Sequence, residues 1–224
     1  MLMRPRIDLS NFRFRTTEKL NLYFSNSIVL WFGTSIVVGL WWIKGRDFTE
    51  MGISMPTFHN KYWIVLCSLV FILYVIDAWF NFNTTEKIRE TRSKWRHSTP
   101  FLPTNVNELI AFGVLAFSAA ICEEILYRGY FITYLVSWWG TGGFAMIFAV
   151  FIPASLFAVA HVYQGWQSVS KILLGAVLFG LIFVFTQSLL LPVALHFFVD
   201  IMGGLLSVFL MHGQEKEVSN EEEE

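Results

Sequence analysis

The sequence predicts an all-α, polytopic membrane helix bundle with about six transmembrane helices. Three observations lead to this prediction: 55% of the 224 residues are hydrophobic, the mean hydropathy is +0.54, and the apolar residues form long runs. A helix needs roughly 20 apolar residues to cross a bilayer, and several of the runs reach that length. A soluble domain with a large core would show shorter, periodic apolar patterns instead.

Six apolar segments alternate with polar connections. A helix over 108–139 would be about 48 Å long, whereas the bilayer core is about 30 Å thick. We therefore expect this third segment to be tilted, broken or partly outside the hydrocarbon, and a break would give seven or eight helices. The polar stretch 81–107 is expected to be a loop that ends at its two prolines. The expected spans are about 26–43, 62–80, 109–139, the turn at 140–143 to about 161, 169–186 and 189–211.

Basic side chains gather on one side of the predicted bundle. Six spans place both termini on the same side as the connection between the second and third spans. By the positive-inside rule, both termini should be cytoplasmic, and we expect an integral protein of the bacterial plasma membrane. The leader and that connection carry five basic residues each: Arg4, Arg6, Arg13, Arg15, Lys19, Lys87, Arg89, Arg92, Lys94 and Arg96.

Composition also excludes some functions. The net charge is −1, and no basic patch lies outside the membrane flanks, so we expect no nucleic-acid partner. Cys67 and Cys122 both lie in apolar segments, which excludes a disulfide framework or a Cys-x-x-Cys metal site. The expected partners are the lipid bilayer and molecules within it.

Three ionisable residues lie inside the third apolar segment. Each costs about 2.5–3.5 kcal/mol at bilayer depth on insertion scales, so three within six residues indicate a function. Glu124 and Arg128 are four residues apart, share a helix face and can pair. Glu123 lies about 100° around the helix and lacks that partner. We interpret Glu124 and Arg128 as structural support and Glu123 as the reactive carboxylate.

Two further clusters lie in later spans. Phe157 and His161 share a face at the end of the fourth span, and His196 and Asp200 share a face in the sixth. Asp200 could accept a hydrogen bond from His196 or orient it. Because membrane helices must bury polar groups against each other, we expect a polar site between the third, fourth and sixth spans.

These motifs resemble a known family. Glu-Glu-x-x-x-Arg at 123–128, Phe-x-x-x-His at 157–161 and His followed four residues later by Asp at 196–200 are similar to the three motifs of the CPBP (Abi) intramembrane proteases. That family includes the type II CAAX prenyl endopeptidases. The resemblance covers about 107–210. The position that is often Asn in the CAAX enzymes is Asp200 here, and an ionised aspartate cannot donate a hydrogen bond.

Composition and the resemblance together lead us to expect three parts of the chain. Residues 1–106 would comprise the basic leader, two transmembrane helices and a basic cytoplasmic loop. Residues 107–211 would form the CPBP protease core with its three motifs. Residues 212–224 would be an acidic, disordered tail.

The resemblance also implies an intramembrane endopeptidase acting on a membrane-associated peptide or protein. Glu123 and His161 would activate water, and His196 and Asp200 would stabilise the oxyanion. The family has been described both as metalloproteases and as glutamate-dependent enzymes. The same four residues could therefore form a zinc site instead. Because the strong His-Glu-x-x-His signature is missing, we favour direct water activation.

Two other classes of function stay open at this point. The first is a non-proteolytic CPBP-fold scaffold or a bacteriocin-immunity-type membrane protein. The second is a proton-coupled transporter that uses the same glutamates and histidines as a relay. Against the transporter, the six spans show no inverted repeat and no paired broken helices.

Overall fold

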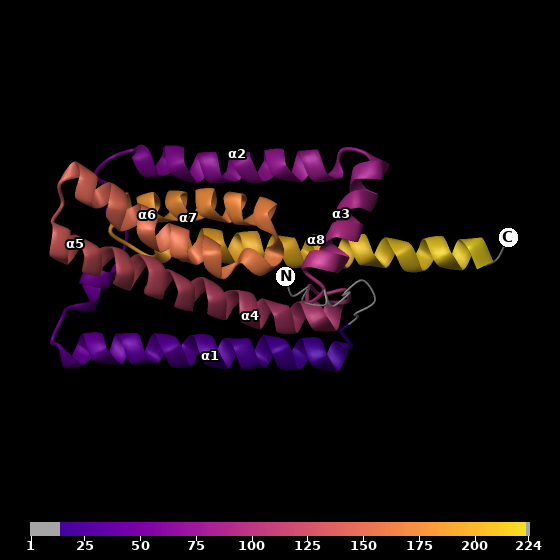
Figure 1. The fold of residues 1–224 in the computed structure, drawn as a ribbon, viewed down its shortest axis with the longest axis horizontal. Helices are drawn as coiled ribbons and strands as arrows, with labels where there is room; N and C mark the ends of the chain where they lie inside the picture. Colours follow the sequence, from indigo (N-terminus) through magenta and orange to yellow (C-terminus); the bar gives the residue numbers. More distant parts are fainter. Residues whose placement is uncertain (1–13, 223–224) are drawn as a thin grey trace, which may run out of the picture.

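The structure is a computed structural model that describes the backbone of residues 14–222 and the side chains of residues 14–211. Arg4, Arg6 and Arg13 of the predicted basic leader lie outside the described residues. All regular secondary structure in the described part is helical, which confirms the predicted fold class (Figure 1). The helices are α1 (Thr16–Ile43), α2 (Tyr62–Phe82), α3 (Thr85–Ser98), α4 (Val106–Glu124), α5 (Thr133–Trp139), α6 (Gly143–Ala160), α7 (Trp166–Thr186) and α8 (Leu190–Glu222).

Six helical segments in the described part are long and apolar enough to cross a membrane, as predicted. The third is continuous from Val106 to Trp139: α4 passes directly into a π-helix, η3 (Ile125–Ile132), and then into α5. The long third segment is therefore not broken, and its irregularity is a change of helix type. The six segments are Thr16–Ile43, Tyr62–Phe82, Val106–Trp139, Gly143–Ala160, Trp166–Thr186 and Leu190–Met211.

The polar connection between the second and third spans is not only a loop, because it contains α3. The hydroxyl of Thr84 caps this helix by accepting a hydrogen bond from the backbone N–H of Lys87 at 3.2 Å. Arg96 and His97 lie in its last turn, where positive charge complements the helix dipole. In Figure 1, α3 crosses the end of the bundle at a large angle to the spans.

Helix α8 also differs from the expectation. Its backbone remains helical to Glu222, into the stretch 212–224 where the sequence predicts a disordered tail. Glutamate, lysine and glutamine are good helix formers, and an existing helix propagates more easily than a new one starts. This part of α8 extends beyond the other helices in Figure 1.

The helices pack so that the motif-bearing segments lie inside the bundle. Helix α4 contacts α1 on one side and α8 on the other, while α7 contacts α2, α6 and α8. In Figure 1, α1 and α2 form opposite edges, and both carry many exposed apolar side chains. In a membrane these side chains contact lipid tails, which are as apolar as they are, so their exposure carries no hydrophobic penalty. Asp77 of α2 pairs with Lys171 of α7 near one end of the bundle.

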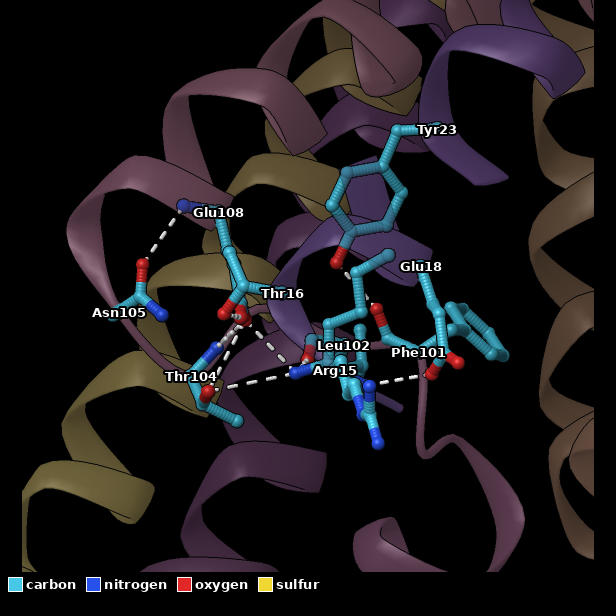
Figure 2. Close-up of polar contacts among 10 residues, drawn as sticks. Arg15, Thr16, Glu18, Tyr23, Phe101, Leu102, Thr104, Asn105 and Glu108 are labelled. Atoms are coloured by element: carbon cyan, nitrogen blue, oxygen red, sulfur yellow. Dashed lines mark hydrogen bonds and ion pairs between the residues drawn. The ribbon is translucent and has the colours of Figure 1, made fainter. Parts of the chain in front are cut away.

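A buried polar cluster joins the start of α1 to the start of α4 (Figure 2). The Lys19 ammonium lies 2.8 Å from a Glu108 carboxylate oxygen, and both side chains are almost fully buried. Glu108 also accepts hydrogen bonds from the Thr16 hydroxyl at 2.7 Å and from the backbone N–H of Thr104 at 2.8 Å. This cluster fixes α1 to α4 and to the connection that precedes α4.

At the opposite end, the short 3₁₀-helix η2 (Phe48–Met51) packs against η3. Met51 is fully buried there. A Cβ atom added at Gly129 of η3 would lie 2.8 Å from the Met51 carbonyl oxygen, so only glycine allows this close approach. The backbone N–H of Leu189 donates to the carbonyl of Gly52 at 2.9 Å and ties the α7–α8 connection to the same segment.

Candidate active site

The centre of the candidate site is a buried triad of Glu124, Arg128 and His196. Glu124 Oε1 accepts hydrogen bonds from Arg128 Nη1 at 2.7 Å and from His196 Nδ1 at 2.8 Å. The glutamate is fully buried and the arginine is 2% exposed. A carboxylate can only accept at this distance, so Nδ1 of His196 carries a proton. Glu124, predicted to support its own helix, also holds the imidazole of α8.

The π-helix positions the arginine of this triad. Arg128 lies in η3, directly after Glu124 ends α4. A π-turn alters the direction in which successive side chains leave the helix, and such turns are frequent at functional sites. Arg128 still reaches Glu124 four residues earlier, and its Nη2 donates to the carbonyl of Ala176 in α7 at 3.2 Å. The guanidinium is thereby fixed from two helices.

The second nitrogen of His196 faces two other carboxylates. His196 Nε2 lies 3.7 Å from Glu123 Oε2 and 3.6 Å from Asp200 Oδ2. Both distances exceed a direct hydrogen bond. The Glu123 side chain is 18% exposed and that of Asp200 is 33% exposed, in contrast to the sealed Glu124. Nε2, on the accessible side of the imidazole, therefore faces the carboxylates of Glu123 and Asp200. Nδ1, on the buried side, is bonded to the carboxylate of Glu124.

His161 approaches the same site through an aromatic ring. It follows the last residue of α6, and its Nδ1 lies 2.8 Å from the Phe157 carbonyl oxygen. The Phe157 ring lies 4.6 Å from the His161 ring and 6.0 Å from the His196 ring, between centroids. In the described part of the chain, His161 makes no direct hydrogen bond to Glu123, His196 or Asp200. The structure thus joins five of the six predicted site residues by polar contacts within 4 Å and leaves His161 beyond Phe157.

Helix α7 contributes to the site although its sequence carries no motif. Phe179 lies 6.1 Å from the ring of His196, and the Arg128 guanidinium lies 5.6 Å from the same phenylalanine. The guanidinium also lies 4.9 Å from the Phe157 ring. These distances allow cation–π attraction in an apolar setting. The sequence predicts a site between the third, fourth and sixth spans only. The contribution of the fifth span, α7, could not be predicted, because Phe179 is one of many apolar residues in that span.

The candidate metal ligands do not converge in the structure. Among the residues whose side chains are described, no group of three or more His, Cys, Asp or Glu could hold a metal ion. Zinc binds at about 2.0–2.3 Å and takes four ligands in structural sites or three in catalytic ones. His196 offers Nε2 near Glu123 and Asp200, whereas the nearest polar partner of His161 is the Phe157 carbonyl.

Comparison with known proteins agrees with the motifs. Residues 105–202 match the family described as type II CAAX prenyl endopeptidase Rce1-like. No curated protein and no solved structure matches the chain. The matched segment contains all six predicted site residues and nearly coincides with the predicted core of 107–211. The match supports the resemblance inferred from the three motifs: residues 105–202 of this integral membrane protein are similar to the CPBP family that includes the CAAX prenyl endopeptidases.

Proposed function

We propose that this protein is an intramembrane endopeptidase that cleaves a peptide bond in or near the membrane. The observation that carries the proposal is the arrangement around His196, whose buried nitrogen is fixed by Glu124 while its other nitrogen faces Glu123 and Asp200. A purely structural cluster has no need for two further carboxylates on its accessible side. The family match suggests the same class of activity.

Glu123 is the proposed base. It is the partly accessible glutamate of the pair, and no arginine neutralises it as Arg128 does Glu124. Its carboxylate removes a proton from water, and the resulting hydroxide attacks the carbonyl carbon of the scissile bond. Because His161 makes no direct hydrogen bond to Glu123 in the described part of the chain, it would accept or relay that proton through an intervening water. When the C–N bond breaks, the proton passes to the leaving amine, which balances the hydrolysis.

His196 and Asp200 are proposed to serve the tetrahedral oxyanion. In its doubly protonated form, His196 keeps Nδ1–H on Glu124 and directs Nε2–H toward the oxyanion. Glu123 and Asp200 provide nearby negative charge that favours this form. Asp200 donates only when it is protonated and otherwise acts through His196. Glu124 and Arg128 hold the imidazole and the motif helix in place, and no step of this mechanism requires a metal.

Zinc is the alternative way to activate the water. His196 Nε2, Glu123 and Asp200 supply ligand types that zinc accepts, and His161 would be the fourth. The bound ion would lower the pKa of its water and polarise the carbonyl. His161 would first have to leave its contact with the Phe157 carbonyl or bind through Nε2. Direct activation by Glu123 does not require His161 to leave that contact.

We propose a membrane-associated peptide or protein as the substrate, and the lipid bilayer as the other partner. His161 follows α6, and Tyr163, two residues later, contacts Phe101 in the connection between α3 and α4, whose carbonyl is hydrogen-bonded to Tyr23 of α1. His161 therefore lies toward the end of the bundle where α1 starts and α3 lies. The positive-inside rule assigns that end to the cytoplasm. Cleavage would then occur near the cytoplasmic side, with both termini in the cytoplasm.

The test compares new protein termini in membranes from cells that express the wild type, Glu123→Gln, or neither. A matched control is Glu50→Gln, which alters a glutamate paired with Arg46 at the opposite end. We expect termini that appear with the wild type and with Glu50→Gln and disappear with Glu123→Gln. The residues beside each new terminus would identify the substrate class.

Equal sets of termini in all membranes, with each protein folded at the same level, would refute proteolysis. The scaffold or immunity-type alternative predicts that result, together with unchanged biological function of Glu123→Gln. Zinc dependence is tested on the same termini: a chelator that abolishes them, followed by restoration with added zinc, would replace direct activation by the metal mechanism.

A further inference from the structure

His161 lies where its helix no longer constrains it. Helix α6 ends at Ala160, and a short 3₁₀-helix, η4 (Val162–Gln164), follows. Gly165 then adopts a positive φ of 91°, which turns the chain toward α7. The orientation of the His161 ring therefore depends on the groups that surround it. Phe157 holds one side through its carbonyl and its ring, as described above.

Tyr163 holds the other side of His161. The two ring centroids are 5.8 Å apart with an interplanar angle of 31°. Partial burial of the phenol raises the pKa of Tyr163, and the charges of Glu123 and Asp200 raise it further. Tyr163 is 57% exposed, and its hydroxyl accepts a hydrogen bond from Gln164 Nε2 at 3.1 Å, which holds the end of the side chain and not the face of its ring. A further contact on the ring is what keeps it against His161.

That further contact comes from the connection before α4. The Phe101 ring lies 5.9 Å from the Tyr163 ring at an angle of 57°. Aromatic pairs in this range contribute about 0.5–1.5 kcal/mol beyond their buried area. Phe101, Tyr163 and His161 thus form a chain of ring contacts that leads from the end of the bundle into the candidate site.

Helix α1 in turn fixes the backbone of this connection. The Tyr23 hydroxyl donates to the Phe101 carbonyl, and Lys19 Nζ donates to the Leu102 carbonyl at 2.8 Å. Figure 2 shows the Tyr23 hydroxyl directed at Phe101. The ring of Tyr23 is fully buried and packs edge-on against Phe112 at 5.6 Å. The connection is therefore held from α1 by two hydrogen bonds to consecutive carbonyls.

We propose that Tyr163 and Phe101 are positioning residues for His161, and that α1 completes the active site by holding Phe101. This inference rests on the proposed function of His161. It assigns a role in catalysis to α1 and to Phe101, which lie outside the matched segment of 105–202. The protease core would then need the N-terminal helix for activity and not only for membrane anchoring.

The first test does not require proteolysis. Diethyl pyrocarbonate modifies accessible imidazoles, and mass spectrometry of the full-length protein in detergent gives the modification rate of each histidine. Tyr163→Ala, Phe101→Ala and Tyr23→Phe should each raise the rate at His161 by about two- to tenfold, from the energy of one aromatic contact. The exposed His59 and His97 serve as internal references that must not change.

Tyr62→Ala is the matched control variant. Tyr62 is 62% exposed and its ring lies 5.3 Å from Phe185, so the same kind of contact is removed away from His161. Its His161 rate should equal that of the wild type. Unchanged His161 rates in Tyr163→Ala and Phe101→Ala would overturn the proposal, and an unchanged rate in Tyr23→Phe would remove α1 from it.

The second test uses the peptide identified by the new termini as substrate. Tyr163→Ala should lower kcat about two- to tenfold with little change in KM, and Tyr163→Phe, which keeps the ring, should restore kcat. A change confined to KM would make Tyr163 a substrate contact, and an equal loss in Tyr163→Phe would assign the effect to its hydroxyl. Either result overturns the positioning role. If the wild type releases no termini, the proposed function fails, while the His161 rates still decide the positioning.

Discussion

The buried pair of Glu124 and Arg128 gives the sharpest prediction about stability. Both side chains are almost fully buried, and Glu124 Oε1 accepts two charge-assisted hydrogen bonds of 2.7 and 2.8 Å. Its other oxygen, Oε2, is buried and has no hydrogen-bond partner in the described part of the chain. Removing one partner of such a pair costs about 3–5 kcal/mol because the other charge is left without compensation.

We therefore expect Glu124→Ala and Arg128→Ala each to lower the free energy of unfolding by about 3–5 kcal/mol. The double variant should lose less than the sum, with a coupling energy of about 0.5–3 kcal/mol, since it leaves no isolated charge between the two positions. The measurement is reversible unfolding in mixed micelles, followed by tryptophan fluorescence.

Glu123→Gln provides the comparison within the same motif. Glu123 makes no contact shorter than 3.7 Å to His196 and is partly exposed, so we expect a loss of about 1 kcal/mol or less. Substitution of Glu124 should thus mainly lower stability, whereas substitution of Glu123 should mainly lower cleavage. Strict additivity of Glu124→Ala and Arg128→Ala, or a loss below about 1 kcal/mol for either, would refute the reasoning from burial.

Three further changes test other parts of the structure. Glu108→Ala should cost about 3–5 kcal/mol in the same unfolding assay, because it leaves the buried Lys19 unpaired; a loss below 1 kcal/mol would contradict this. Gly129→Ala should lower the free energy of unfolding by about 1–3 kcal/mol through overpacking. Gly39→Ala, whose added Cβ atom meets nothing within 4 Å, should be neutral or stabilising. Equal effects of the two substitutions would refute the close approach of Gly129 to Met51. Asp200→Asn adds a hydrogen-bond donor, so the release of termini should stay within about threefold of the wild type or rise; complete loss would make the carboxylate itself essential.

Local sequence patterns sufficed for much of the fold. The six spans follow from apolar runs, and their observed bounds differ from the predicted ones mainly at the ends, most at Thr16, where α1 begins ten residues earlier than expected. Hydropathy does not predict the polar first turns of α1. Thr16 and Lys19 can be buried there because both bond to the carboxylate of Glu108, which is distant in the sequence. Helix α3 was missed for a related reason, since its charge pattern resembles that of a loop.

The sequence predicts some contacts of the candidate site and misses others. Spacing of four residues correctly paired Glu124 with Arg128 and placed His196 near Asp200. It could not reveal that Glu124 also binds His196, because those residues are 72 positions apart. The spacing allows Asp200 to accept a hydrogen bond from His196 or to orient it. In the structure Asp200 lies 3.6 Å from His196 Nε2, and the hydrogen bond to this imidazole is made by Glu124 at Nδ1.

The membrane class, the number of spans and the resemblance to the CPBP family could be read from the sequence, since these depend on hydropathy and on motifs within single helices. The tertiary structure alone decided which helix faces meet, and so brought α7 to the site and joined α1, through Tyr23 and Phe101, to the surroundings of His161. The physical reason is that lipid and neighbouring helices are equally apolar, so the rotation of a membrane helix leaves little trace in its hydrophobic pattern.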